Sequence, residues 1–377
     1  MKRTWKAGYS FGMPSKRLPW NSPKNAFTRL LEERRSAGAR LIDLTLSNPT
    51  QAGIAYPGAE ILDALRDERA LVYEPDPRGL REAREAVAAA NLVSPDAVLL
   101  TASTSEAYAL MFKMLCDPGD SVLVPQPSYP LFDHLAALEG VLVEPYDLRM
   151  ETRWSAALPH ATKAKAVLAV SPNNPTGSYF LPEDAGNVGQ LGVPLVVDAV
   201  FADYAFGVAP PPPRALRDLD VFTLGGLSKA AGLPQMKLGW ILATGPGAPE
   251  ALDRLAAVAD AYLSVSAPVM RAAPRLLALA PRIRSRIAAR TRANLDSLRK
   301  AAGRRLLEPQ GGWYAVVEAP ASRTDEAWAL ELLREDGVIA HPGYFFNFPR
   351  EAFLVVSLLP REEEFREGVA RLAARLT

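Results

Sequence analysis

The sequence has little of several features that would mark particular classes of protein. It contains one cysteine, Cys116, which follows an apolar run and is interpreted as a buried thiol, so a disulfide framework within the chain is excluded. Its three histidines, His134, His160 and His341, do not have the spacing of a metal site, and we expect no metal. No apolar stretch approaches the roughly 20 residues of a membrane-spanning helix, and no apolar signal region follows the first residues. We therefore expect a cytoplasmic protein without a membrane partner.

An excess of charge of one sign is also missing. Lys and Arg together number 43 and Asp and Glu 42, which gives a formal net charge of +1. A chain so nearly neutral lacks the basic field that nucleic acids require, and no nucleic-acid partner is expected. The hydrophobic share of 49% and the charged share of 23% are typical of globular proteins. With 377 residues, the chain is long enough for a large domain and a smaller one.

Short apolar runs alternate with amphipathic segments between about residues 97 and 243. This pattern predicts an α/β fold whose large domain has a mostly parallel, seven-stranded sheet covered by helices on both faces. The predicted strands are 98–101, 121–124, 141–143, 166–170, 195–197, 221–224 and 238–242.

A second unit is predicted from the remaining segments. Helical patterns at 250–263 and 282–302 are separated by Pro268, Pro274 and Pro281, which should kink or break any helix, so a domain boundary is expected there. We predict a large domain over 46–274 and a small α+β domain over 275–377, together with an irregular, proline-containing N-terminal arm over 1–45. The expected elements of the small domain are strands at 313–317, 338–340 and 353–357, and a closing helix at 361–376.

Polar residues that directly follow strands are the candidates for a site, because a parallel sheet binds its ligand at the carboxyl ends of its strands. Ser103, Thr104 and Ser105 lie between a strand and a helix that starts near Glu106. Small hydroxylated residues at this place can cap the helix and present free N–H groups to an anion such as phosphate. A simple helix cap is the alternative.

Three further segments of this kind follow later strands. The turn Ser171–Gly177, fixed by prolines and a glycine, would aim Asn174 at the strand end. Asp198 ends a buried β-branched run, where a carboxylate is either solvated or paired with a cation. Lys229 follows Ser228 in a chain with only ten lysines, and a desolvated lysine can serve as a Schiff-base amine. A plain turn and a surface lysine are the alternatives.

Taken together, these segments resemble the signature blocks of the class I and II aminotransferases in the aspartate-aminotransferase superfamily, in order and in separation. The resemblance covers roughly residues 40 to 377. Further matching blocks are Tyr73 with Gly79–Ala83, Pro127–Pro130, Gly311–Tyr314 and His341–Gly343. One block alone is weak, but several in the same order are specific.

The resemblance implies the fold of a pyridoxal-phosphate-dependent transferase and a role for each matching residue. Lys229 would carry pyridoxal 5'-phosphate as a Schiff base and move the substrate proton, so Lys229 and Asp198 would be the catalytic pair. Asp198 would keep the ring nitrogen protonated, Asn174 would donate to the phenolic oxygen, and Tyr129 would stack on the ring. The residues that would hold the phosphate are Ser103, Thr104, Ser105, Ser228 and, from a neighbouring subunit, Tyr73. The resemblance also implies a homodimer with shared active sites. The reaction it implies is between an amine or amino acid and a keto acid or aldehyde.

At three positions the sequence departs from the family pattern. Phe201 stands where the family usually has a tyrosine that also bonds the phenolic oxygen, and Lys237 where it has an arginine that grips the phosphate. Val355 stands where the family has the arginine that binds the substrate carboxylate. Either another cation replaces that arginine, or the natural substrate lacks a carboxylate there. The conceivable replacements are Arg350, Arg361, Lys16 and Arg17.

Two other classes of function compete with aminotransfer. The same scaffold and cofactor support lyases, decarboxylases and racemases, and the missing carboxylate clamp at Val355 is the best argument for one of these. A non-catalytic module that binds the cofactor is less favoured, because Lys229 is kept and no DNA-binding region is appended. A nicotinamide-binding enzyme is excluded because no G-x-G-x-x-G follows the first strand.

Overall fold

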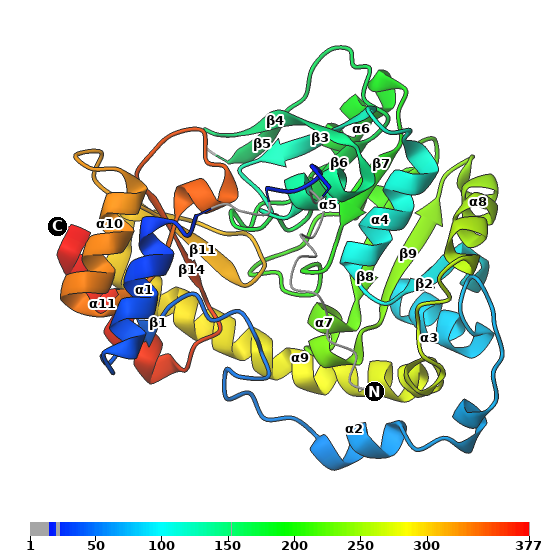
Figure 1. The fold of residues 1–377 in the computed structure, drawn as a ribbon, viewed down its shortest axis with the longest axis horizontal. Coiled ribbons are helices and arrows are strands. Elements are labelled where there is room, and N and C mark those ends of the chain that lie inside the picture. Colours follow the sequence, from blue (N-terminus) through cyan, green and yellow to red (C-terminus); the bar gives the residue numbers. More distant parts are fainter. Residues whose placement is uncertain (1–14, 20–22, 152, 377) are drawn as a thin grey trace, which may run out of the picture.

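The larger sheet organises the molecule. The structure, a computed structural model, describes residues 15–19, 23–151 and 153–376. Within these residues, the larger sheet has eight strands in the order β2-β9-β8-β7-β6-β3-β4-β5 (Figure 1). Their bounds in this order are Val98–Thr101, Gly239–Thr244, Val221–Gly226, Leu195–Asp198, Val167–Val170, Ser121–Gln126, Leu142–Met150 and Trp154–Ala157. The strands from β8 to β4 are parallel neighbours, whereas β9 is antiparallel to β2 and β8, and β5 to β4.

All seven predicted strands are present, but the predicted strand count was wrong because β5 adds an eighth. The missed part is the edge hairpin of β4 and β5, where β4 also runs well beyond the predicted 141–143. In β4 only Tyr146 and Leu148 are buried, and in β5 only Trp154. An edge hairpin with so few buried residues lacks the continuous apolar run from which the other strands were predicted.

Helices cover both faces of this sheet, which explains why its central strands are apolar throughout. On one face, Leu168 and Phe222 pack with residues of α4 (Thr104–Leu115), α5 (Phe132–Glu139) and α8 (Ala248–Asp260). On the other face, alternate strand residues such as Val167 and Val197 pack with α6 (Pro182–Leu191). The remaining helices near the sheet are α2 (Gly58–Ala64), α3 (Arg81–Asn91) and α7 (Leu227–Ala230).

One long helix, α9 (Ala267–Ala302), links the region of the larger sheet to that of the smaller one (Figure 1). The prediction that prolines would break this stretch was wrong, because α9 continues through Pro274 and Pro281. Each proline removes one backbone donor, but the buried face of the helix, which includes Leu276, Ile283 and Ile287, holds it in place by packing. The division into 46–274 and the rest stays a prediction.

The smaller unit is built around a four-stranded antiparallel sheet in the order β10-β11-β14-β13. Its strands are Leu306–Leu307, Tyr314–Glu318, Phe353–Ser357 and His341–Pro342, and its helices are α10 (Asp325–Glu331) and α11 (Glu362–Leu376). Beside it, β1 (Ile42–Asp43) pairs in parallel with β12 (Val338–Ile339). The three strands and the closing helix predicted here are confirmed.

The prediction of an irregular N-terminal arm was wrong for residues 26–36. This segment forms α1 (Ala26–Ser36), whose first turn is capped by the Asn25 side chain accepting from the Thr28 N–H at 2.7 Å. Phe27 of α1 is buried in the core of the smaller unit, and α1 lies beside α10 (Figure 1). Residues 1–14 and 20–22 of the predicted arm lie outside the described residues.

Candidate active site

Three predicted segments meet at the carboxyl ends of β6, β7 and β8. The Ser171 N–H donates to the Asp198 carbonyl at 2.9 Å, and the Ala199 N–H donates to the Leu224 carbonyl at 2.9 Å. Lys229 lies on α7, directly after β8. Adjacent parallel strands thus bring together the turn after β6, the carboxylate that ends β7 and the lysine after β8, as the sequence predicted.

The Asp198 carboxylate is buried and held at both oxygens. The residue is 6% exposed; Oδ1 accepts from the Val200 N–H at 3.1 Å and Oδ2 accepts from the Tyr108 hydroxyl at 3.2 Å. Burial raises the pKa of Asp198 to about 6, although both hydrogen bonds and the charge of Lys229 oppose the rise. The carboxylate is therefore costly to ionise unless a cation pairs with it.

The Lys229 amine is also desolvated. Burial lowers the pKa of Lys229, against the opposing effect of the Asp198 charge. Its Nζ lies 5.4 Å from the ring centroid of Trp313 and 5.9 Å from that of Phe201. The Tyr204 hydroxyl donates to the Lys229 carbonyl at 2.7 Å and so fixes the backbone that carries the amine. A lowered pKa favours the uncharged, nucleophilic form of this lysine.

The turn after β6 presents a buried amide. Asn173 anchors the turn, since its Nδ2 donates to the Pro127 carbonyl at 3.1 Å and its Oδ1 accepts from the Ser128 hydroxyl at 2.6 Å. Asn174 is 8% exposed, and its Oδ1 has no hydrogen-bond partner among the described residues. A buried amide with an unsatisfied atom fits a site that a polar ligand completes.

Ser103 is the N-cap of α4, as predicted. Its hydroxyl accepts from the Glu106 N–H at 3.2 Å, while the Glu106 carboxylate accepts from the Ala102 N–H at 2.6 Å. Thr104 and Ser105 are the first two residues of the helix. The cap interpretation is therefore confirmed, and phosphate binding at this helix start stays a prediction.

Two aromatic residues named from the sequence lie at the same centre. Tyr129 packs edge-on against Phe132 with the ring centroids 5.7 Å apart, and Phe132 packs in turn against Tyr108, which contacts Asp198. Burial and, to a smaller extent, the charge of Asp198 raise the pKa of Tyr129 to about 12. Phe201 is buried and packs edge-on against Trp313 with the ring centroids 5.4 Å apart. Together with Tyr314, at 6.1 Å from Phe201, these rings make one wall of the site apolar.

Three other predicted residues are not joined to this centre by a contact within the described chain. Lys237 is exposed and has a positive φ of 50° at the end of a short helix, η4 (Pro234–Met236). Tyr73 is 78% exposed. Ser228 is partly buried beside Lys229 on α7. The roles assigned to them stay predictions.

Val355, at the position of the expected carboxylate-binding arginine, lies in β14 and is 1% exposed. It belongs to an apolar cluster with Val316, Phe346 and Phe353. Of the conceivable replacements, the Arg350 Nη1 donates to Glu318 Oε1 at 2.9 Å.

The other conceivable replacements are not placed in the site by any contact of the described residues. The Arg17 Nη1 donates to the Leu138 carbonyl at 3.0 Å. Arg361 lies against Gly53, and Arg361 and Lys16 are exposed.

Sequence reasoning missed three aromatic residues at this centre. Tyr108 contacts Asp198, Tyr204 contacts the Lys229 backbone, and Trp313, whose buried Nε1 has no partner among the described residues, lies near the Lys229 amine. Trp313 lies in a block that carried the resemblance, so the signal was available. Tyr108 and Tyr204 occupy apolar positions of their segments, and nothing in the pattern separates them from core residues.

Comparison with known proteins agrees with this geometry. The family model for aminotransferase class I and II matches residues 40–372. Glutamate-pyruvate aminotransferase AlaA of Haemophilus influenzae is 26% identical over 93% of each chain, and human tyrosine aminotransferase is 25% identical over 89% of this chain and 81% of the relative. The solved structure of an alanine aminotransferase from Pyrococcus furiosus has the same fold, with a TM-score of 0.84 at 23% identity over 96% of this chain and 99% of that one.

The chain belongs to the class I and II aminotransferase family. It is an aminotransferase, an enzyme that transfers an amino group between amino and keto compounds. This result favours the transferase over the lyase, decarboxylase, racemase and non-catalytic alternatives. The family uses pyridoxal phosphate.

Among the described residues, no helix is both long enough and apolar enough to cross a membrane.

Proposed function

We propose that this aminotransferase holds pyridoxal 5'-phosphate at the Lys229 amine. The observation that carries the proposal is that the buried carboxylate of Asp198 and the partly buried, desolvated amine of Lys229 follow adjacent strands, with the buried side chain of Asn174 at the neighbouring strand end. A cationic ring nitrogen would supply the counter-charge that the Asp198 carboxylate lacks, and the amide N–H of the buried Asn174 side chain would donate to a phenolic oxygen. When bound, this cofactor supplies an electron sink for the carbanion formed on the substrate.

The chain's own residues then have defined tasks. Asp198, oriented by Tyr108 and Val200, would hold a proton at the ring nitrogen, and Tyr129 would stack against the ring. Lys229, with its lowered pKa, accepts a proton from the substrate α-carbon and returns it. The phosphate would be held by the start of α4 at Ser103, Thr104 and Ser105, and by Ser228 and Lys237.

Borohydride trapping tests this assignment. Protein loaded with pyridoxal phosphate and treated with borohydride should carry a stable label on Lys229, mapped by mass spectrometry of peptides. Lys229→Ala should take up no label, while Lys163→Arg, at an exposed lysine, should be labelled like the wild type. A label on another lysine, or none, would sink the proposal.

We further propose that the preferred amino donor carries an apolar group where the family resemblance would place a carboxylate. The relatives are named for amino-acid substrates, but Val355 here lies in an apolar cluster with Phe346 and Phe353, and Arg350 is paired with Glu318. A carboxylate against that cluster would lose water without gaining a cation. Donors such as simple amines avoid this cost.

Paired donors that differ only in the carboxylate provide the test. 2-Phenylethylamine should be turned over with a kcat/KM at least equal to that of phenylalanine, with pyruvate as acceptor for both. Because the acceptor, pyruvate, is the same in both assays, any difference in kcat/KM is due to the donor. Faster turnover of phenylalanine and other α-amino acids would refute the donor proposal while leaving the aminotransferase assignment intact.

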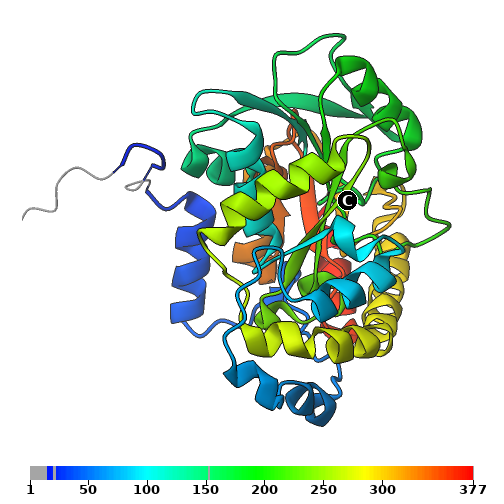
Figure 2. The same cartoon turned by 90° about the vertical axis from the view of Figure 1, so that its right-hand side faces the viewer.

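We also propose a homodimer with shared active sites. Besides Tyr73, other large apolar side chains are exposed in the same region. The short helix η1 (Glu68–Leu71) ends at Leu71, which is 88% exposed, and the next residue, Val72, is 56% exposed. Leu62 of α2 is 64% exposed, and α2 lies on the outer side of α9 in both views (Figures 1 and 2). An exposed apolar surface of this kind favours burial against a second copy.

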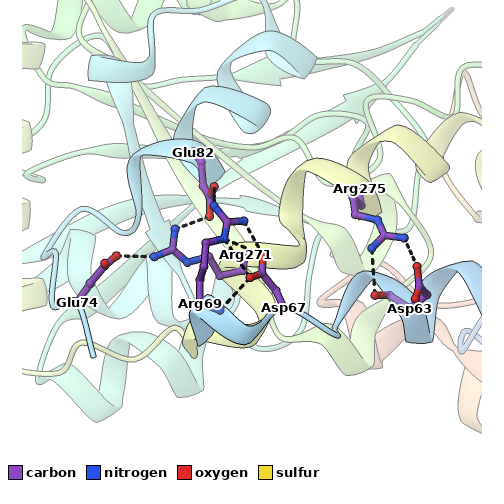
Figure 3. A network of polar contacts seen from close by, with 7 residues as sticks. All are labelled: Asp63, Asp67, Arg69, Glu74, Glu82, Arg271 and Arg275. Atoms are coloured by element: carbon purple, nitrogen blue, oxygen red, sulfur yellow. Dashed lines mark hydrogen bonds and ion pairs between the residues drawn. The ribbon is translucent and has the colours of Figure 1, made fainter. Parts of the chain in front are cut away.

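A polar network holds the segment next to Tyr73 in place (Figure 3). The Arg271 guanidinium, 11% exposed, pairs with Glu82 at 2.7 Å and with Glu74, the neighbour of Tyr73. Arg69 of η1 contacts Asp67 and Glu82 from the other side. An ordered segment presents Tyr73 outward at a low cost in conformational entropy.

Analytical ultracentrifugation should show a dimer, and mixing two inactive variants tests the sharing of sites. Lys229→Ala and Tyr73→Phe subunits, denatured and refolded together, should regain activity if one subunit's tyrosine completes the other's site. A monomer, or no recovery although each variant dimerises, would contradict the shared site. The cytoplasmic location and the absence of nucleic-acid and membrane partners stay predictions.

A further inference from the structure

A cavity of about 340 Å³ lies behind the end of β7 and behind α7, which carry Asp198 and Lys229, on the side of the sheet where α9 packs. Its walls include Ala199 and Val200, which follow Asp198, and Ala230, which follows Lys229. Leu277 and Ala280 of α9 close another side. Its size suits a small organic molecule, and its lining combines apolar side chains with polar and charged groups.

A second cavity of about 230 Å³ adjoins the first one. The two share five lining residues, including Asp203, Arg214 and Thr223. One wall of the second cavity is the proline run 210–213, which the aminotransferase site does not use and which forms a stiff backbone. Arg214 directly follows this run and lines both cavities.

The charged groups in this cavity pair leave one cation over. Arg284 forms an ion pair with Asp203 at 2.8 Å. Arg214 lines the same cavity, but no carboxylate of the described residues lies within ion-pair distance of it; its Nη2 donates to the Asn91 carbonyl at 3.3 Å. Two guanidinium groups therefore face one carboxylate.

The environment of Arg214 is unfavourable for an isolated charge. Burial lowers the pKa of Arg214, and only the charge of Asp203 opposes this. A partly desolvated guanidinium gains most from an anion that enters beside it, because its fork donates two parallel hydrogen bonds to a carboxylate.

We propose that this cavity pair is a second binding site of the protein, separate from the aminotransferase centre, for a small organic monocarboxylate. The carboxylate lies at Arg214, and the apolar body lies along Leu277, Ala280 and Ala230. A ligand with a single negative charge balances the one excess cation, Arg214. The ammonium group of a free amino acid would have no free carboxylate to pair with, because Asp203 is already paired with Arg284. The ligand contacts the backbone directly after Asp198 and Lys229, and so adjoins the catalytic groups from behind.

Benzoate is a suitable probe because it combines one carboxylate with a compact apolar ring. Isothermal titration calorimetry of the cofactor-loaded enzyme with benzoate should show binding. Benzamide has the same shape without the charge, and its affinity should be lower than that of benzoate by about tenfold or more. Equal binding of benzoate and benzamide, or no binding of benzoate, would overturn the proposal.

Variants of one charge series place the binding at Arg214. Arg214→Gln should weaken benzoate binding about tenfold or more, and Arg214→Lys, which keeps the charge but not the fork, should weaken it less. Arg217→Gln removes an exposed arginine from the same loop and should bind benzoate like the wild type. Thermal melts check that each variant is folded.

If Arg214→Gln is folded and binds benzoate as the wild type does, the benzoate lies elsewhere and the proposal fails. This outcome is independent of the aminotransferase assignment, because Lys229 labelling and amino transfer are measured separately.

Discussion

The Tyr108 hydroxyl donates to Asp198 Oδ2 at 3.2 Å, so a residue of α4 orients the carboxylate that ends β7. Both side chains are buried, and Tyr108 is fixed by edge-on packing against Phe132 with the ring centroids 5.4 Å apart. Because the Val200 N–H occupies the other oxygen, the carboxylate has one fixed orientation relative to Lys229. Tyr108 is therefore a positioning residue for Asp198.

Tyr108→Phe removes this donor without changing the shape of the core. We expect kcat to fall about tenfold with little change in KM, because the hydrogen bond acts on the carboxylate and not on the substrate. The pKa of Asp198 should rise above about 6 in the cofactor-free protein, since one group that lowers it is gone. Tyr146→Phe, which removes a buried hydroxyl bonded to the Leu168 carbonyl at 2.8 Å, is the matched control. Unchanged kcat and an unchanged pH profile in Tyr108→Phe would contradict this role.

The stability of the cofactor-free protein should depend on Asp198 with a definite sign. The pKa of Asp198 is raised from 3.8 to about 6 by burial, so between these values the folded state keeps a proton that the unfolded chain loses. Stability therefore falls as pH rises through this window. The loss is complete above about pH 6 and is on the order of 2 to 3 kcal/mol.

Asp198→Asn should escape this loss. Urea unfolding of the cofactor-free proteins is measured at pH 4 and pH 7.5. The free energy of unfolding of the variant should exceed that of the wild type at pH 7.5 only. Asp133→Asn, at an exposed position, should show no such gap. A variant that is less stable than the wild type at pH 7.5 would show that Asp198 is not desolvated as described.

Phe201→Tyr should restore a second donor beside Asn174. Phe201 already lies at the centre, with its ring 5.9 Å from the Lys229 Nζ, so a hydroxyl there can reach a phenolic oxygen of the bound cofactor. A donor that stabilises the deprotonated form lowers a pKa, and the pH midpoint of the visible absorbance should fall by about one unit. Phe206→Tyr is a control outside this wall. Identical midpoints in Phe201→Tyr and wild type would refute the idea.

Lys237→Arg should slow the loss of cofactor on dialysis severalfold. Lysine keeps the charge but lacks the planar fork that matches phosphate geometry. The measurement is the fraction of visible absorbance that remains with time, and Lys163→Arg serves as a matched exchange at an exposed lysine. No slowing would mean that the side chain at 237 does not reach the phosphate.

The sequence predicted best where burial and local chemistry point the same way. The central strands are buried on both faces, so their apolar runs were unambiguous, and Asp198 and Lys229 follow directly from their ends. The edge strand β5 and the helix through Pro274 and Pro281 were not predictable, because tertiary packing overrides weak or adverse local signals there.

The candidate site shows the same limit. Residues next to strand ends could be named, but Tyr108 reaches Asp198 from a helix 90 positions earlier, and only the folded structure shows that its hydroxyl faces a carboxylate. The apolar surroundings of Val355 likewise depend on strand pairing, since β14 brings it opposite His341 and Val316.

The pairing of β1 with β12 affects the order in which the chain can fold during synthesis. Ile42 pairs with Val338, and the Ser357 N–H donates to the Leu44 carbonyl at 2.6 Å. The early segment that contains Phe27 and Leu44 therefore lacks its pairing partners during synthesis until almost the whole chain has been made. The strands of the larger sheet emerge from the ribosome before that point. A chaperone that shields short apolar segments of nascent chains would meet this one for longer than any strand of that sheet.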